Sequence, residues 1–280
     1  MNILVGDSGA TKTDWVLLGG EEPQFIQTEG LNPHLLTAEE FFQILVKELK
    51  PNLLGKSINR IYFFGAGCGA SEKKKEVEKY LSKVFEESAI HVQTDLDGAG
   101  LALFGQREGI VCILGSGSSA GFYKEGRLVK QMPSIGYPFG DEGSASQIGQ
   151  KLLISYLDGS MDKKLRTYFE DQEDIDYPEL FYRLQQPREA KLYVGHVCKV
   201  FAKKSSHREV QAIIYDGFSE FLDNVIEFFP EESKSYELGF VGSIASVFES
   251  ELRACAKQKG VEIYSVIRSP IEHIALQFSR

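Results

Sequence analysis

Residues Ile3–Leu18 read ILVGDSGATKTDWVLL and decide how the chain begins to fold. Apolar runs at both ends flank a short polar connection, which is the pattern of two antiparallel strands joined by a tight turn. The pattern returns at Ile110–Tyr123, where a strand enters the sequence Gly115-Ser-Gly-Ser-Ser119 and a second strand follows. A repeated unit is a stronger guide to architecture than a single element. The sequence therefore predicts two copies of one unit, each opening with a hairpin.

The polar turn of the first hairpin has the chemistry of a phosphate site. Asp7 ends the first strand, where a carboxylate can hold a divalent metal, often through water. Gly9 lets backbone N–H groups approach a phosphate, and Thr11 and Lys12 can donate to its oxygens. The turn is not a Walker A loop, because no G-x-x-x-x-G-K-[ST] string is present. An ordinary hairpin with a polar turn is the alternative.

Strands and helices alternate along the rest of the chain. In the first unit, the expected elements are strands at Gln24–Thr28, Ile61–Phe64 and Ile90–Thr94, a helix with a Thr37–Glu40 capping box, and a helix capped by Ser71. In the second unit, strands are expected at Leu128–Met132, Glu237–Val241 and Val261–Ser265. The expected helices are short ones in 160–205, a long one with Val210–Phe229 on its apolar face, one from Ile244 to Lys259 stopped by Gly260, and one starting at Pro270. This order predicts an α/β protein.

Composition excludes several classes of partner. The 280 residues are 42% hydrophobic and 25% charged, with a net charge of −9, which argues against a nucleic-acid or anionic-membrane surface. The apolar runs are too short to span a bilayer, and a strand at the very start leaves no room for a signal peptide. The cysteines, Cys68, Cys112, Cys198 and Cys255, are scattered and form no C-x-x-C pair. We therefore expect reduced thiols in a cytoplasmic protein.

Glycine-rich or acidic turns follow several strands, and in an α/β sheet such turns converge on one cleft. Asp97, just after a strand, is the candidate general base that would accept the proton of an acceptor hydroxyl. Asp95 is its competitor, two residues away. The alternative for Asp97 is a helix N-cap.

Three further polar residues are candidates for ligand contacts. Asn32, in a Pro-containing loop, can donate to and accept from a polar ligand. Asp141 suits sugar hydroxyls, and Glu142 could instead reach a metal-bound water. The alternatives are a plain turn asparagine and acids that match a helix N-terminus.

Taken together, these motifs resemble a known superfamily. Asp7–Lys12 resembles the first phosphate motif of the actin, hexokinase and heat-shock-70 ATPases, and Gly115–Ser118 is similar to the second. Val241–Ser243 resembles the adenosine-side motif. Gly140–Ser144, with the sequence GDEGS, resembles the signature of N-acetylglucosamine kinase and its BadF/BadG-type relatives.

The resemblance implies an α/β fold of two ribonuclease-H-like (actin-like ATPase) domains around a central cleft. The boundaries expected are 1–107 and 108–280, the second domain carrying a helical insertion and the last helix able to pack back on the first domain. The implied cofactors are ATP and Mg²⁺, and the implied reaction moves the γ-phosphoryl of ATP to the 6-hydroxyl of N-acetylglucosamine or a close relative. The implied partner is this small amino sugar, and a homodimer is compatible with the family.

By position, Asp97 matches the catalytic aspartate of the family and Asp7 the acid on the Mg²⁺ side. Asn32 and Asp141 match sugar contacts, and Ser116 stands where a threonine that contacts the sugar is usual. The matches to nucleotide contacts are Gly9, Thr11, Lys12, Gly117, Ser118, Gly242 and Ser243. Two departures are Ala66 in place of a serine beside the substrate, and a 270–275 segment without the usual Gly-Ala pair.

Two other functions are consistent with the same motifs. A BadF/BadG-type activator of a radical dehydratase would need an iron–sulfur cluster bridging a dimer, for which only Cys68 is near a suitable place. A nucleotide-dependent regulatory binding protein would bind ATP without phosphorylating a product.

Overall fold

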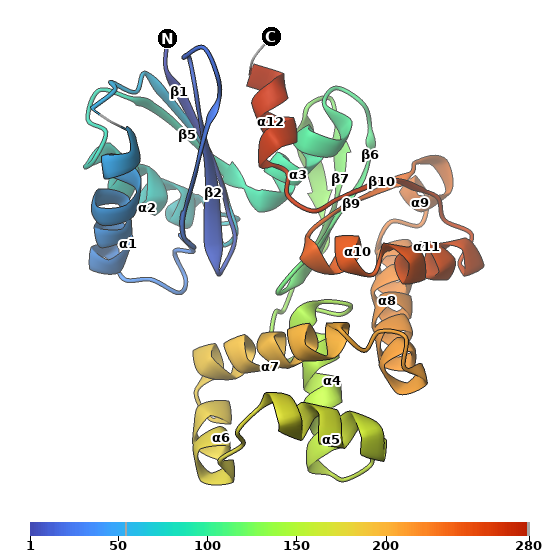
Figure 1. Ribbon diagram of the computed structural model, residues 1–280. Helices are drawn as coiled ribbons and strands as arrows, with labels where there is room; N and C mark the ends of the chain where they lie inside the picture. The colour runs from blue at the N-terminus through green and yellow to red at the C-terminus, as the bar shows by residue number, and fades with distance from the viewer. Residues whose placement is uncertain (54, 279–280) are drawn as a thin grey trace. The chain divides into compact units, whose positions relative to one another are not determined.

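The computed structural model describes residues 1–53 and 55–278 (Figure 1). It contains two five-stranded sheets, ordered β3-β2-β1-β4-β5 and β10-β9-β6-β7-β8. If each of β1–β5 is replaced by the strand five places later, the first order becomes β8-β7-β6-β9-β10. This is the second order read from its other end. The predicted α/β class and the predicted doubling of one unit are therefore confirmed.

The chain forms two compact units. Unit 1 comprises Met1–Glu108, Tyr123–Val129 and the segment from Ser269, and unit 2 comprises Gly109–Phe122 and Lys130–Arg268. No helix in the described part of the chain is long and apolar enough to cross a bilayer.

Unit 1 is built on the first sheet. Its strands are β1 (Ile3–Ser8), β2 (Lys12–Leu18), β3 (Gln24–Glu29), β4 (Arg60–Gly65) and β5 (Ala89–Thr94), and its α-helices are α1 (Ala38–Ile44), α2 (Ser71–Ser82), α3 (Asp95–Phe104) and α12 (Ile271–Phe278). Strand β1 pairs antiparallel with β2 and parallel with β4. The carboxyl ends of β1, β4 and β5 therefore lie at one edge of the sheet, and this edge carries Asp7 and the start of α3.

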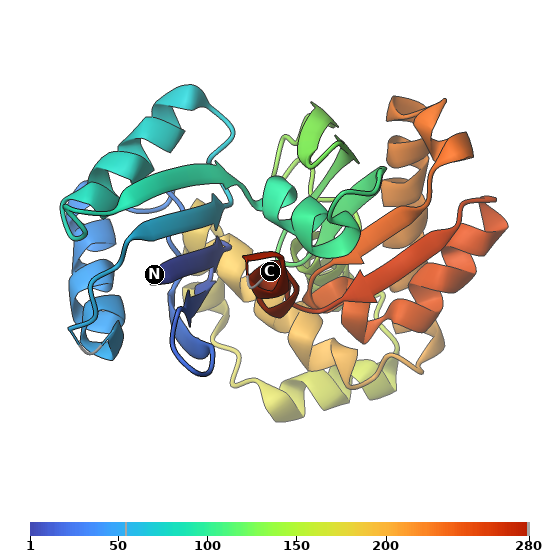
Figure 2. The ribbon, with the colours of Figure 1, turned by 90° about the horizontal axis from the view of Figure 1, so that it is seen from above.

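Alternating residues of the central strands face two different layers. Leu4, Trp15 and Phe63 belong to one buried cluster with side chains of α1 and α2, which lie on the same side of the sheet (Figure 2). Phe64 points the other way, because a Cβ on Gly98 of α3 would lie 2.8 Å from its side chain. This two-residue period is what a sheet covered on both faces requires.

Unit 2 is built on the second sheet and includes the helices between β8 and β9. Its strands are β6 (Gly109–Leu114), β7 (Ser118–Lys124), β8 (Arg127–Gln131), β9 (Leu238–Val241) and β10 (Ile263–Ile267), with the tip of the β7–β8 hairpin grouped in unit 1. Its helices are α4 (Ala145–Leu157), α5 (Lys163–Gln172), α6 (Tyr177–Leu184), α7 (Pro187–Ala202), α8 (Arg208–Phe228), α9 (Glu232–Ser235), α10 (Ser243–Val247) and α11 (Glu249–Gln258).

Helices α4 and α7 cross closely within this unit (Figure 1). A Cβ on Gly149 of α4 would lie 1.8 Å from the backbone oxygen of Val194 in α7, so only glycine permits this approach. The contact fixes α7 against the helix that follows the GDEGS sequence.

Four local predictions are wrong. Ser71 does not cap α2, because Ala70 occupies the N-cap position and makes no side-chain capping bond. The segment expected as one helix from Ile244 to Lys259 is two helices, because Phe248 leaves helical geometry at φ −114° and ψ 35° and its side chain is buried. The last strand starts at Ile263 rather than Val261. The insertion is not made of short helices alone, because α7 has 16 residues.

The buried hydroxyl of Tyr123 yields a first prediction. The side chain is fully buried, and its hydroxyl has no hydrogen-bond partner among the described residues. A buried donor without a partner costs about 1–3 kcal/mol. Tyr123→Phe is therefore expected to leave the free energy of unfolding in urea unchanged or to raise it.

Tyr156→Phe is the matched control for this experiment. The hydroxyl of Tyr156, on a residue that is also buried, contacts Glu170 at 3.2 Å and the Tyr177 hydroxyl at 3.1 Å, so its removal is expected to destabilise. A loss of more than about 1 kcal/mol in Tyr123→Phe would contradict the interpretation.

Candidate functional site

The polar turn of the first hairpin is held by Ser8. Its hydroxyl lies 2.8 Å from the Thr13 hydroxyl across the turn and accepts a hydrogen bond from the Leu31 N–H at 2.9 Å. Its backbone oxygen accepts from the Ala66 N–H at 2.8 Å. One residue thus joins the hairpin, the loop that carries Asn32 and the glycine-rich turn after β4. The predicted phosphate turn is therefore a fixed structure and not a mobile tip.

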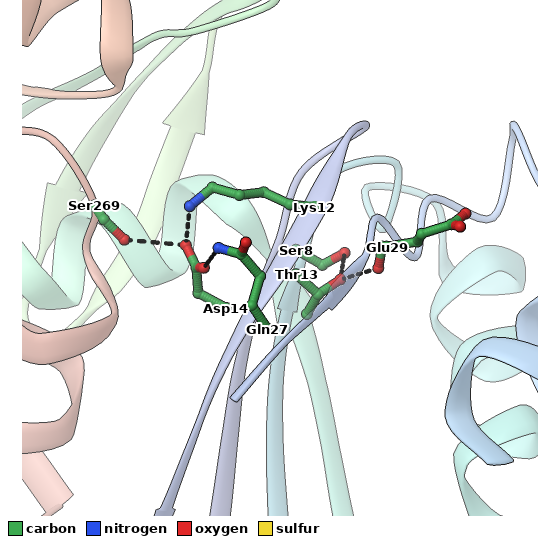
Figure 3. A network of polar contacts seen from close by, with 7 residues as sticks. All are labelled: Ser8, Lys12, Thr13, Asp14, Gln27, Glu29 and Ser269. Atoms are coloured by element: carbon green, nitrogen blue, oxygen red, sulfur yellow. Dashed lines mark hydrogen bonds and ion pairs between the residues drawn. The ribbon is translucent and has the colours of Figure 1, made fainter. Parts of the chain in front are cut away.

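Lys12 is engaged at the edge of the same turn (Figure 3). Its ammonium lies 2.5 Å from the Asp14 carboxylate, which also accepts hydrogen bonds from Gln27 and Ser269. Because Lys12 is 54% exposed, its ammonium can exchange Asp14 for a phosphate at little cost. The neighbouring Thr11 is exposed as well, so both predicted phosphate donors are accessible.

Asp7 and Asp95 form an acidic pair at the carboxyl edge of the first sheet. Burial, followed by the neighbouring charges of Asp95 and Asp14, raises the pKa of Asp7 to about 8, against a lowering by the charge of Lys12. Burial also raises the pKa of Asp95 to about 6, against a hydrogen bond from the Leu96 N–H. Asp95 therefore keeps a carboxylate that is ionised at neutral pH and lies beside Asp7.

Asp97 takes part in the N-terminal cap of α3. Its Oδ2 accepts hydrogen bonds from the hydroxyl of Thr94 at 2.6 Å and from the Thr94 N–H at 3.1 Å, and the Thr94 hydroxyl accepts from the Asp97 N–H. Its Oδ1 accepts from the Leu128 N–H at 3.3 Å. Asp97 therefore occupies the N3 position of a capping box whose N-cap residue is Thr94. Both of its oxygens are used to hold α3 and the β7–β8 hairpin.

Asn32 and the turn after β4 lie together in unit 1. The Oδ1 of Asn32 accepts a hydrogen bond from the His34 N–H at 2.9 Å, and a Cβ on Gly67 would lie 2.6 Å from the same oxygen. Lys73 of α2 donates to the Pro33 carbonyl at 3.0 Å. The Asn32 loop is thus packed on the glycine-rich turn and fastened to α2. Within residues 1–53 and 55–278 the amide nitrogen of Asn32 donates to no partner, so it can donate to a ligand.

Unit 2 contains the second phosphate turn. Gly115 donates its N–H to the Gly117 carbonyl at 3.0 Å, while Ser116 at the tip is exposed. Gly242 lies against this turn, because a Cβ on it would be 2.2 Å from the Leu114 oxygen, and its φ of 129° suits only glycine. Ser243 follows it, exposed, at the first position of α10. The predicted phosphate and adenosine motifs of this unit are therefore direct neighbours.

Asp141 is buried beside the same turn and is only 5% exposed. Its Oδ1 accepts a hydrogen bond from the Ser118 N–H at 3.1 Å, and its Oδ2 lies 2.9 Å from the ammonium of Lys191. A Cβ on Gly117 would lie 2.8 Å from Oδ1, so Gly117 must be glycine for Asp141 to take this place. Lys191 has no counterpart in the sequence-based prediction, because it is 50 residues away and belongs to no motif.

Asp7 has the chemistry of a magnesium ligand. No three histidine, cysteine or carboxylate side chains form a metal cluster within residues 1–53 and 55–278. Mg²⁺ does not need one, because it commonly keeps several waters and binds through one or two carboxylates and the phosphates of its substrate. Burial and the nearby acids raise the pKa of Asp7, and a bound cation would offset both effects.

Cys68 is not suited to an iron–sulfur cluster. Its side chain is fully buried in the core of unit 1. Burial, together with the charge of Asp95, raises the pKa of the Cys68 thiol to about 12. Cluster ligation needs a thiolate that a second subunit could approach, and Cys68 offers a buried neutral thiol instead.

The candidate residues gather at two places, one in each unit. Unit 1 holds Asp7, Gly9, Thr11, Lys12, Asn32, Asp95 and Asp97, and unit 2 holds Ser116, Gly117, Ser118, Asp141, Gly242 and Ser243. A central cleft with the two turns facing each other stays a prediction.

No protein-family model matches the sequence, and no curated protein sequence matches it. Solved structures do match. The putative N-acetylglucosamine kinase of Porphyromonas gingivalis is 28% identical, with a TM-score of 0.91 and 98% of each chain covered. The fold is that of the actin-like sugar kinases.

Two more distant structures share this actin-like sugar kinase fold. The putative N-acetylglucosamine kinase of Chromobacterium violaceum is 17% identical, with a TM-score of 0.76 over 99% of this chain and 98% of that one. A ROK family glucokinase of Streptomyces griseus, in complex with glucose and AMPPNP, is 11% identical, with a TM-score of 0.59 and 100% of both chains covered. These neighbours agree with the family resemblance of the motifs.

Proposed function

We propose that this protein is an ATP-dependent sugar kinase that phosphorylates the 6-hydroxyl of N-acetylglucosamine or a close relative. The observation that carries the proposal is the acidic pair Asp7 and Asp95 beside the turn of the first hairpin, in a chain whose fold matches that of sugar kinases. The 28% identity to the Porphyromonas gingivalis protein over the whole chain supports the choice of an amino sugar.

Asp95 is the proposed general base, in place of Asp97. A base needs a carboxylate that is ionised near neutral pH and still free to accept a proton. Asp95 has a pKa of about 6, and its carboxylate accepts from backbone N–H groups at the start of α3, with Leu96 at 3.0 Å. Asp97 already accepts three hydrogen bonds, two from Thr94 and one from the Leu128 N–H, and these hold its carboxylate in the cap of α3. Asp95 would orient the acceptor hydroxyl and take its proton as the phosphoryl group is transferred.

The two glycine-containing turns are proposed to bind the polyphosphate. The Lys12 ammonium and the Thr11 hydroxyl, with the backbone N–H groups of 10–11 and 116–117, would supply the donors, since the N–H groups of Gly9, Gly115 and Ser118 already donate within the protein. Gly242 and Ser243 would flank the nucleoside side of the same ligand. Mg²⁺, held by Asp7, would neutralise the phosphate charge.

Asn32, Ser116 and Asp141 are proposed to hold the sugar. Asn32 offers its amide N–H₂ and Ser116 an exposed hydroxyl. Each Asp141 oxygen already has one partner, and a carboxylate oxygen has a second lone pair for a sugar hydroxyl. Ala66 would present a methyl group instead of a hydroxyl near the acceptor.

The experiment that tests this function is coupled ADP release with N-acetylglucosamine, glucosamine, N-acetylmuramic acid and glucose in turn. ADP release is expected to rise at least tenfold over the sugar-free rate with one amino sugar, because a positioned hydroxyl replaces water as acceptor. ATP binding with no stimulation by any of the four sugars would contradict a kinase and favour a regulatory binding protein.

A further inference from the structure

We propose that Lys191 is a positioning residue of the active site, acting through Asp141. The proposal rests on the proposed kinase function, because the parts that Lys191 would position are the second phosphate turn and a sugar-binding carboxylate. Lys191 lies outside every motif and comes from the helical insertion of unit 2.

The contact is an ion pair between a buried acid and a mostly buried lysine. The Nζ atom of Lys191 lies 2.9 Å from the Oδ2 of Asp141, and the exposed fractions of the side chains are 31% and 5%. A carboxylate this deep needs a counter-charge or hydrogen bonds. Lys191 is its one cationic partner within the described part of the chain, and the Ser118 N–H is its other contact.

Asp141 transmits this contact to the backbone of the phosphate turn. Its Oδ1 accepts from the Ser118 N–H, and its carboxylate occupies the space that a Cβ on Gly117 would need. Asp141 itself has a φ of 65°, a left-handed conformation that is uncommon outside glycine. A carboxylate in such a conformation keeps its place only while its contacts hold it.

Helix α7 is a rigid support for the lysine. Gly149 of α4 touches the backbone of Val194, one turn after Lys191. Helix α4 itself starts directly after Asp141, at the Ser144 N-cap. The ion pair between Lys191 and Asp141 therefore closes a ring through α7, α4 and the GDEGS segment. Asp141 joins this ring to Ser118 of the phosphate turn, so the ion pair helps to fix the turn.

The test is a double-mutant cycle of kcat on the full chain, with Lys191→Met, Asp141→Asn and both together. Lys191→Met keeps the apolar stem and removes the charge, and it is expected to lower kcat at least about tenfold, because small displacements of catalytic groups cost this much. In the Asp141→Asn background, Lys191→Met should change kcat by less than about twofold, since a residue that acts through another is not additive with it.

Lys199→Met is the control, because Lys199 lies exposed on the same helix away from Asp141. It should leave kcat unchanged, and Lys191→Arg, which keeps the charge, should restore most of the activity. If Lys191→Met does not fold, Lys191→Gln takes its place in the cycle. A kcat for the charge-removing variant within about twofold of wild type, or an equal loss in both backgrounds, would overturn the proposal.

Amide hydrogen exchange of Ser118 separates this proposal from the kinase assignment. Measured on the chain without ligand, exchange should be at least about tenfold faster in Lys191→Met than in wild type or Lys199→Met, because the acceptor of that N–H has lost its support. Unchanged exchange would overturn the role of Lys191 whatever the enzyme phosphorylates. Faster exchange in a protein without sugar kinase activity would contradict the proposed function alone.

Discussion

Asp95→Asn is expected to lower kcat for sugar phosphorylation by roughly 10²- to 10⁴-fold, the usual contribution of a general base. The amide cannot accept the proton of the acceptor hydroxyl, although it has almost the same size as the carboxylate. Binding of an ATP analogue, measured by calorimetry, should change little, because Asp95 is not among the residues proposed to bind the nucleotide. Asp95 is thus proposed to act in the chemical step and not in nucleotide binding.

Asp97→Asn is the matched comparison, since it makes the same change two residues later. It removes the charge from the capping box and weakens the contact with the Leu128 N–H. We expect a loss of about 1 kcal/mol in the free energy of unfolding, as for other N-terminal caps, and a kcat within about tenfold of wild type. If Asp97→Asn is inactive and Asp95→Asn is active, Asp97 and not Asp95 is the general base.

Asp7→Asn is expected to have the second largest effect, a loss in kcat on the order of 10²-fold or more. Mg²⁺ contributes several kcal/mol of charge stabilisation in phosphoryl transfer, and each 1.36 kcal/mol corresponds to a factor of about ten. Titration with Mg²⁺ should show a weaker metal dependence of the residual activity. Asp14→Asn is the control on the partner strand, because Asp14 binds Lys12, Gln27 and Ser269 and is not a proposed metal ligand.

The raised pKa of Asp7 also predicts the pH dependence of stability. The folded-state pKa of about 8 lies above the ordinary value of 3.8, so the folded chain holds this proton more tightly than the unfolded chain. The free energy of folding that the protonated Asp7 carboxyl contributes is therefore present at low pH. It is lost as the pH rises through about 8. In EDTA, the melting temperature should fall between pH 6 and 8, and Asp7→Asn should flatten this fall.

Added Mg²⁺ should reverse the loss at pH 8, because a ligand that binds only the folded state stabilises it. A melting temperature that rises with pH over this range in EDTA, or one that Asp7→Asn does not alter, would contradict the environment assigned to Asp7.

The hairpins and the doubled sheet could be predicted because local pattern decides them. In Ile3–Leu18 the apolar runs and the small polar turn specify two paired strands, and the same signals recur at Ile110–Tyr123. The end of α11 could also be predicted from the sequence. Gly260 has a φ of 73°, its N–H donates to the Lys257 carbonyl, and the Val261 N–H donates to the Ala256 carbonyl. These are the bonds of a glycine C-cap, which sequence alone can indicate.

Features set by distant packing could not be read in this way. The break at Phe248 has no Gly or Pro signal, and the burial of its ring in the core of unit 2 requires it. Lys191 reaches Asp141 across 50 residues only after α7 has packed on α4. For the acids after β5 a local signal did exist. Thr94 and Asp97 form the spacing T-x-x-D of a capping box, which assigns Asp97 to the helix start and leaves Asp95 for chemistry.

The most direct measurement of the central claim is the identity of the product from ATP and N-acetylglucosamine, observed by phosphorus NMR and mass spectrometry. The wild type is expected to form the sugar 6-phosphate and ADP in equal amounts, and Asp95→Asn to form neither at a comparable rate while still binding the nucleotide. Release of inorganic phosphate with the sugar unmodified, or equal yields of sugar phosphate from wild type and Asp95→Asn, would contradict the claim that Asp95 directs phosphoryl transfer to a sugar hydroxyl.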